Sequence, residues 1–475
     1  MQLEDLAPEL LTLILRTVDS PRSLYRLISA SPACWQVFSS SPEFILSSVV
    51  KNVISYDLLN LYLAVIHVPA FTGDLELFRQ QVPIFLDAYF DSKLFAFPTT
   101  KADLVGLCRL NTHVSYLSVQ YFQSAIYALG YEKHMYALER ESPTTMIHFS
   151  SSERTESMHD LLRLDSYFRE FPQNGIPEYE DRLIYAMHAE KRECAVPPSH
   201  SERVRFLRAF LRFELYSRVF PSGWKRQHNC LSTHDAAEQS HLFVKRMEPW
   251  EIEEMSCVHH YYSSVAGRLL DELEEELVRA VQTAPGVTFT SPQLDLDQML
   301  GISDNRLTFF NRLDLIGLDV YSRTGRWDSS TYIGYIVSLG IDFMHKLAVG
   351  DKVRRSALIR STLSKFGRPF LPEALEELPA RQPIVRPLGN NWNNDPSLPN
   401  AAYYRCRNTI TNSYLKILDN PSGLREMAYM FWDCNRSEKQ PVYGKLDDAG
   451  WLSNEKRKKL FDRSERQSAE ERLQG

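Results

Sequence analysis

Apolar positions near the start of the chain predict a helix with two apolar faces. In the stretch LEDLAPELLTLIL, residues 3–15, leucine and isoleucine recur at helical spacing. One face holds Leu10, Leu13 and Ile14, and the next holds Leu11, Leu15 and Val18. A helix on a protein surface normally carries one apolar stripe, which packs on the core. We therefore expect either the rest of the chain or another protein to cover the second face.

Three Ser-Pro pairs divide the residues that follow into short predicted helices. The pairs begin at Ser20, Ser31 and Ser41. Serine is a preferred N-cap, and proline suits the first helical turn because no backbone donor is needed there. Upstream, Asp5 is the predicted cap of the first helix, and Pro8 lies in its first turn. The pattern thus predicts a compact N-terminal module of three short helices.

Most of the remaining chain has an apolar period close to that of an α-helix. Helices are predicted over residues 75–90, 103–129, 154–171, 178–194, 201–220, 235–283, 332–366 and 400–418. We expect the longest of these to break near Pro249, because proline lacks the helical N–H donor. Alternation typical of strands is confined to residues 287–290 and 306–310. The sequence therefore predicts a mainly α-helical protein.

Composition shifts divide the chain into four predicted parts. Residues 1–48 form the three-helix module, and residues 49–368 form a large, irregular helical body. Residues 369–399 hold seven prolines and end in LGNNWNNDPSLP, which opposes regular helix and predicts a loop or an extended wrap. Residues 400–475 form a C-terminal helical segment with a charged tail. Within this segment, the aromatic sequence YMFWDCNR at 429–436 is interpreted as core or cap residues.

The overall composition is that of an ordinary globular protein of 475 residues. Its net charge of -6 gives no overall basic field, so we expect no nucleic-acid partner. The seven cysteines are never closely paired, which predicts reduced thiols and a cytoplasmic or nuclear location. No uncharged run reaches the roughly 18 residues that span a bilayer, and no membrane partner is predicted.

The sequence lacks the common motifs for phosphate binding, serine activation and metalloprotease zinc. The nearest approach to a metal site is a group of histidines and cysteines: His228, Cys230, His234, His241, Cys257, His259 and His260. Zinc accepts these residue types, but their spacing matches no standard ligand pattern. We therefore predict no metal, no cofactor and no enzymatic activity. An enzyme with a site assembled from scattered residues is the weaker alternative.

Two polar stretches have both a functional and a structural interpretation. Asn391, Trp392, Asn393 and Asn394 offer the stacking and paired hydrogen bonds of a recognition loop. The interpretation that we favour is an anchor, in which the tryptophan pins a long loop to the body. The basic run at 456–459 fits a nuclear import signal, but its acidic neighbours favour a solvated helix face.

The N-terminal residues resemble an F-box, in particular the F-boxes of filamentous-fungal proteins. That family's pattern begins Leu-Pro, any residue, Glu, Leu-Leu and continues to an Ile-Leu pair, a leucine-rich second helix and a closing aromatic residue. The matching positions are Leu6, Glu9, Leu10, Leu11, Ile14, Leu15, Leu24, Leu27 and Trp35. Ala7 stands where the family has its signature proline, and Pro8 follows it. More loosely, the rest of the chain resembles helical regions of fungal F-box-like proteins.

The resemblance implies a role in recruiting other proteins. F-boxes lay apolar helices against a Skp-type adaptor, which is itself bound to a cullin–RING ubiquitin ligase. Residues 6–35, Pro8 included, are then expected to bind the adaptor, while the helical body presents an unknown protein target. Four or five buried leucine or isoleucine side chains contribute about 1.5–3 kcal/mol each before association costs.

Two alternatives to this interpretation stay open. In the first, the N-terminal helix packs only into the core of its own protein. In the second, the chain is a helical interaction scaffold with an F-box-like fold that does not enter a ubiquitin ligase. Exposure of the second apolar face in the folded chain would favour a partner over the first alternative.

Overall fold

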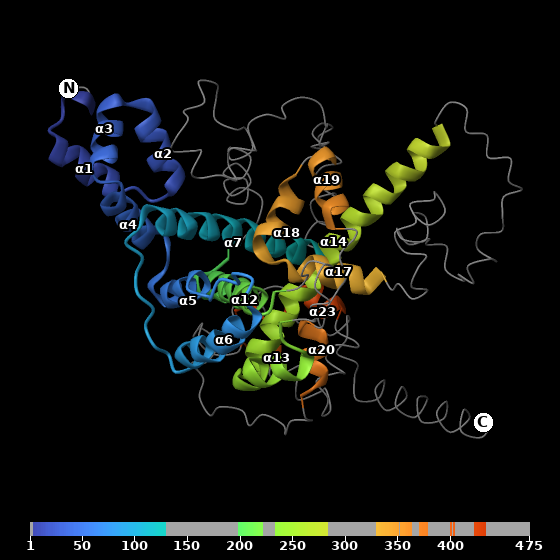
Figure 1. The fold of residues 1–475 in the computed structure, drawn as a ribbon. Helices are drawn as coiled ribbons and strands as arrows, with labels where there is room; N and C mark the ends of the chain where they lie inside the picture. Colours follow the sequence, from blue (N-terminus) through green and yellow to red (C-terminus); the bar gives the residue numbers. More distant parts are fainter. Residues whose placement is uncertain are drawn as a thin grey trace, which may run out of the picture.

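The computed structural model describes residues 3–129, 198–221, 233–283, 329–350, 352–362, 370–378, 400, 402–403 and 422–433. These residues form fifteen α-helices and no strand, which confirms the predicted mainly α-helical class (Figure 1). The predicted helices over 154–171 and 178–194 and both strand-like stretches lie outside the described residues, as does most of 400–418. None of the described helices is both long and apolar enough to cross a lipid bilayer.

Four short helices form the N-terminal module. They are α1 (Pro8–Arg16), α2 (Pro21–Ala30), α3 (Pro32–Ser40) and α4 (Pro42–Val53), each with proline in its first turn. The predicted boundary at residue 48 lies inside α4. α4 packs against both α1 and the long helix α7 (Lys101–Ala128), so that it joins the module to the body. The N-terminal module therefore contains a fourth helix, α4, in addition to the three that were predicted.

Serine side chains cap two of these helices as predicted. Ser20 Oγ accepts a hydrogen bond from the N–H of Ser23 at 3.0 Å, at the start of α2. Ser31 Oγ accepts one from the N–H of Cys34 at 3.4 Å, at the start of α3. Ser41 precedes α4 in the same way, but its side chain makes no capping hydrogen bond. The Ser-Pro pattern thus marks all three helix starts, while the hydroxyl acts as a cap at two of them.

Replacing Ser20 with alanine is expected to lower the free energy of unfolding by about 1 kcal/mol. The reason is that the N–H of Ser23 loses its acceptor at the first turn of α2. Ser41→Ala is the matched control, because Ser41 is an exposed N-cap without a capping bond, and its expected change is under about 0.5 kcal/mol. Urea unfolding of the two variants measures both effects, and equal losses would contradict this assignment.

The start of α1 differs from the prediction. The prediction that Asp5 caps this helix is wrong, because Asp5 belongs to a preceding 3-10 turn, η1 (Leu3–Asp5). The N-cap is Ala7, with φ of -60° and ψ of 145°, and its methyl side chain cannot accept hydrogen bonds from the free N–H groups of the first turn. Pro8 occupies the first turn as predicted. The N-cap of α1 therefore lies two residues after the predicted one, because η1 precedes the helix.

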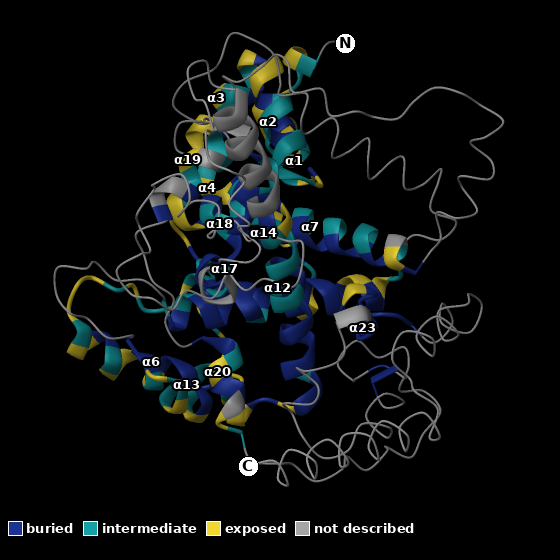
Figure 2. Cartoon of the chain, turned by 90° about the vertical axis from the view of Figure 1, so that its right-hand side faces the viewer, coloured by how far each residue is buried: buried dark blue, intermediate teal, exposed yellow. Residues whose placement is uncertain are grey.

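The body is arranged around α7 and α12 (His200–Val219), which pack against each other. α5 (Tyr56–Ile66) and α18 (Gly340–Val349) each contact both of these helices, and α14 (Pro249–Thr283) crosses α12. α12 is buried along almost its whole length (Figure 2). α6 (Leu75–Phe90) and α13 (Ala236–Leu242) lie at the end of the molecule far from α1–α3 (Figure 1).

Breaks between helices follow the prediction in one place and depart from it in another. The segment 235–283 breaks before Pro249, as predicted, into α13, the turn η3 (Val244–Arg246) and α14. The single helix predicted over 332–366 is divided into α17 (Ser329–Ser338), α18 and α19 (Lys352–Thr362). Gly340 has a φ of +79°, a conformation that glycine adopts without steric cost. The apolar period continues through this glycine, so periodicity alone could not locate the break.

A short helix, α20 (Leu371–Glu376), lies in the proline-rich stretch for which we expected no regular helix. Pro372 falls in its first turn, where the missing N–H is not needed. Glu373 accepts a hydrogen bond from the N–H of Phe370 at 3.0 Å, which stabilises the start of the helix. The prolines of this stretch thus position a helix start here instead of preventing one.

Candidate protein-docking surface

The two apolar faces of α1 differ sharply in burial. Leu11 is 2% exposed and Leu15 is 0% exposed, within the core of the module. On the opposite face, Leu10 is 49% exposed and Leu13 is 55% exposed. Ile14 lies between the two faces and is half-buried. The described part of the chain therefore covers one apolar face of α1 and leaves the other in solvent.

The packing of α1 explains this division. α1 packs against α3 on one side and α4 on another, and these contacts take up the face that holds Leu11 and Leu15. Leu24 of α2 is 1% exposed in the same core. These three side chains thus lie in the core of the module in the free chain, and their contact with an adaptor stays a prediction.

The other predicted adaptor-binding residues lie at or near the surface. Pro8 and Glu9 are exposed at the start of α1, beside the exposed leucines. Leu6, Leu27 and Trp35 are half-buried and pack against the core of the module. Part of each of these three side chains thus stays accessible, while the rest supports the fold.

Sequence reasoning missed two contributors to this surface, Arg16 at the end of α1 and Phe44 on α4. Phe44 is 52% exposed, and the guanidinium carbon of Arg16 lies 4.1 Å from the centroid of its ring. Leu13 precedes Arg16 by one helical turn. We name Leu10, Leu13, Arg16 and Phe44 together the α1–α4 surface. Phe44 lies outside residues 6–35, the stretch predicted to bind the adaptor, so only the packing of α4 beside α1 reveals it.

The histidines and cysteines that suggested a metal site lie in other environments. His228 and Cys230 fall outside the described residues. The ring of His234 packs near those of Phe78 and Phe220. Cys257 is fully buried, and burial raises the pKa of its thiol. Within the described residues, no group of three or more histidine, cysteine or acidic side chains is placed to hold a metal ion.

The histidines of α14 are expected to make the stability of the fold depend on pH. Burial, and to a smaller extent the charge of Arg425, lower the pKa of His259 to about 3 and the pKa of His260 to about 4. An unfolded chain takes up protons on these histidines near their ordinary pKa of about 6.5. In the folded chain the same histidines stay neutral until a lower pH. The free energy of unfolding is therefore highest above about pH 6.5 and decreases progressively below it.

Acidification from about pH 7 to about pH 5 is therefore expected to lower the free energy of unfolding. His259→Leu is expected to reduce this dependence, because the variant has one fewer group that binds a proton only when the chain unfolds. Urea unfolding of the wild type and the variant at both pH values measures the change. An unaltered pH dependence in the variant would contradict the role of His259.

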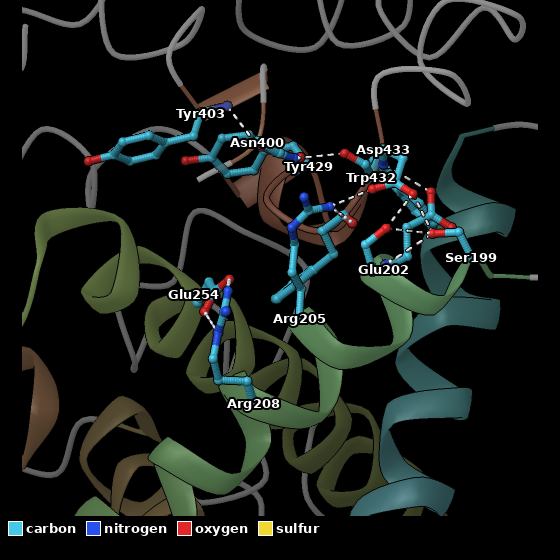
Figure 3. Close-up of polar contacts among 12 residues, drawn as sticks. Ser199, Glu202, Arg205, Arg208, Glu254, Asn400, Tyr403, Tyr429, Trp432 and Asp433 are labelled. Atoms are coloured by element: carbon cyan, nitrogen blue, oxygen red, sulfur yellow. Dashed lines mark hydrogen bonds and ion pairs between the residues drawn. The ribbon is translucent and has the colours of Figure 1, made fainter. Parts of the chain in front are cut away.

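A buried polar network holds Asp433 against the start of α12 (Figure 3). Asp433 accepts hydrogen bonds from the hydroxyls of Ser199 and Ser201, and it forms an ion pair with Arg205 at 2.6 Å. Glu202 accepts the N–H of Asp433 at 3.0 Å. Partners here are separated by up to 234 residues, so no local pattern could have revealed them.

Aromatic packing and two further ion pairs complete this anchor. Residues 429–432 are buried, which confirms the interpretation of YMFW as core. Glu253 of α14 accepts two hydrogen bonds from Arg425, and Glu254 binds Arg208 of α12 at 2.6 Å. Asn400 donates to the carbonyl groups of Tyr429 and Trp432. Each of these buried carboxylates is paired with an arginine, and the pair of Glu253 and Arg425 ties residues 422–433 to α14.

Comparison of the chain with models of known protein families, with curated proteins and with solved structures found no match. The possible recognition loop at 391–394 and the basic run at 456–459 lie outside the described residues. The α1–α4 surface is therefore the feature of the described residues that bears most directly on function.

Proposed function

We propose that this chain is a substrate-receptor subunit of a cullin–RING ubiquitin ligase. Its N-terminal module would bind a Skp-type adaptor, and its helical body would present a target protein. The observation that carries the proposal is the exposure of Leu10 and Leu13 on a helix whose opposite face is fully buried. Their position in an F-box-like sequence supports the choice of adaptor. In this function the chain performs no chemistry of its own.

The energetics favour the two leucines as anchors of a larger interface. A fully buried leucine contributes about 1.5–3 kcal/mol, so covering the exposed half of both contributes roughly that amount in total. A stable interface buries about 800 Å² on each partner and involves about 20–30 residues. Phe44 and the accessible part of Ile14 add apolar area beside the leucines. The remaining contacts of such an interface complete the shape and exclude water.

The position of the module in the fold suits a receptor. α1–α3 lie at one end of the molecule, whereas α6 and α13 lie at the other (Figures 1 and 2). An adaptor bound to α1 would leave the far end of the body free for a target. The contribution to ubiquitin transfer would then be proximity, because target and ubiquitin-charged enzyme are held in one assembly.

Co-expression of the full chain with a Skp-type adaptor, followed by addition of the cullin, tests this function. We expect one complex that contains all three proteins on size-exclusion chromatography. Leu13→Glu is the matched control, because it places a charge on the exposed face and leaves the core unchanged. Failure of the wild-type chain to bind the adaptor would overturn the proposal. An adaptor complex that excludes the cullin would favour an interaction scaffold instead.

A further inference from the structure

Arg16 is held in one position between α1 and α4. Its Nε donates a hydrogen bond to Ser48 Oγ at 3.0 Å, and its guanidinium group stacks on the ring of Phe44. The carbonyl group of Arg16 accepts a hydrogen bond from Asn52 Nδ2 at 2.7 Å, which ties the end of α1 to α4. The guanidinium is therefore placed by the fold and has little freedom left to lose when a partner binds.

The positive charge of Arg16 lies at the end of an apolar strip. Leu13 lies one turn before Arg16 on α1, Leu10 lies one turn before Leu13, and Phe44 flanks the guanidinium group on α4. All three apolar side chains are about half exposed or more. The α1–α4 surface thus combines apolar area with one fixed cation.

Arg16 differs from the buried arginines of the body in lacking a carboxylate. Arg205, Arg208 and Arg425 each pair with an acidic side chain. Among the described residues, Arg16 has no ion pair, and its terminal nitrogens have no acceptor. A guanidinium offers a planar fork of donors that matches a carboxylate. The group therefore has the charge, the geometry and the fixed position to bind an acidic side chain of another protein.

From these contacts we propose that Arg16 and Phe44 extend the docking surface of α1 onto α4. The partner surface that fits them presents a carboxylate to Arg16 beside apolar side chains that cover Leu13 and Phe44. This inference rests on the proposed function, so the partner is the Skp-type adaptor. It adds Phe44, which lies outside the predicted adaptor-binding stretch 6–35, and it makes the charge of Arg16 a determinant of which adaptor surface is accepted.

Calorimetric titration of the full chain with a Skp-type adaptor tests this extension. Phe44→Ala and Arg16→Gln are each expected to weaken binding about tenfold, as for other anchoring residues. Arg16→Gln should also reduce the dependence of affinity on salt, because an exposed charge pair is screened. Arg16→Lys keeps the positive charge, so it should retain most of the salt dependence of the affinity, although it lacks the planar set of guanidinium donors. Ile84→Ala on α6 is the control, since Ile84 is 71% exposed far from the module.

The outcomes separate this inference from the function on which it rests. Loss of binding in Leu13→Glu with unchanged affinity in Phe44→Ala and Arg16→Gln would overturn the extension and leave the proposed function in place. Absence of binding by the wild type would overturn both. A third outcome is that the chain binds no adaptor but self-associates, and that Phe44→Ala abolishes the self-association. A second copy would then occupy this surface, and both proposals would be overturned. Thermal unfolding of each variant verifies that the module stays folded.

Discussion

Glu253→Ala is expected to lower the free energy of unfolding by about 3–5 kcal/mol, because it leaves a buried arginine without its carboxylate. The Nε and Nη2 atoms of Arg425 donate to the two carboxylate oxygens of Glu253 at 2.9 and 2.8 Å. Both side chains are almost completely buried. Burial alone would lower the pKa of Arg425, but the charge and hydrogen bonds of Glu253 outweigh it and raise that pKa. The arginine therefore stays charged and requires its partner.

Chemical unfolding of the full chain measures this loss. Glu426→Ala is the matched control, since Glu426 is the neighbour of Arg425 in the same helix but is exposed. The control should change stability by less than about 0.5 kcal/mol. Replacing Glu253 and Arg425 together with methionine should recover most of the loss, because no buried charge is then left unpaired. A double variant as unstable as Glu253→Ala would contradict this explanation.

Charges placed on the exposed face of α1 are expected to abolish adaptor binding without unfolding the module. Leu10→Glu and Leu13→Glu together should weaken the affinity at least about 100-fold, because they place carboxylates in an apolar interface. Stability should change little, since both side chains are half exposed in the free chain. Co-elution with the adaptor measures the first effect, and thermal unfolding measures the second.

The buried face of α1 supplies the comparison. Leu15→Ala should lower the free energy of unfolding by about 2–5 kcal/mol, because it leaves a cavity in the core of the module. The exposed and the buried apolar face of α1 are thus expected to give opposite results. Unfolding by the double glutamate variant, or tight adaptor binding by it, would show that the exposed face has another role.

The sequence pattern located most helices but could not rank the two faces of the first one. Residues 75–90 were predicted and observed as α6, because the apolar period and the flanking polar residues agree there. Leu10 and Leu11 are equivalent in a periodic pattern, and only the positions of α3 and α4 decide which of them is buried. The same packing brings Phe44 beside Arg16, which no motif could indicate.

Buried charges were the other feature beyond the reach of sequence reasoning. Glu253 and Arg425 are separated by 172 residues, and each resembles any surface charge in its local sequence. Their burial depends on how α14 and α23 (Ser422–Glu426) pack together, which is a tertiary property. The core assignment of residues 429–432 succeeded because clustered aromatic residues indicate burial without knowledge of their partners.

Side-chain footprinting of the full chain, with and without a Skp-type adaptor, tests the central claim most directly. Hydroxyl-radical labelling read by mass spectrometry reports the exposure of individual leucine and phenylalanine side chains. We predict that the adaptor protects Leu10, Leu13 and Phe44, while Leu15 stays unlabelled and Ile84 stays labelled in both states. Unchanged labelling of Leu10 and Leu13 at saturating adaptor would contradict the docking surface on which this account depends.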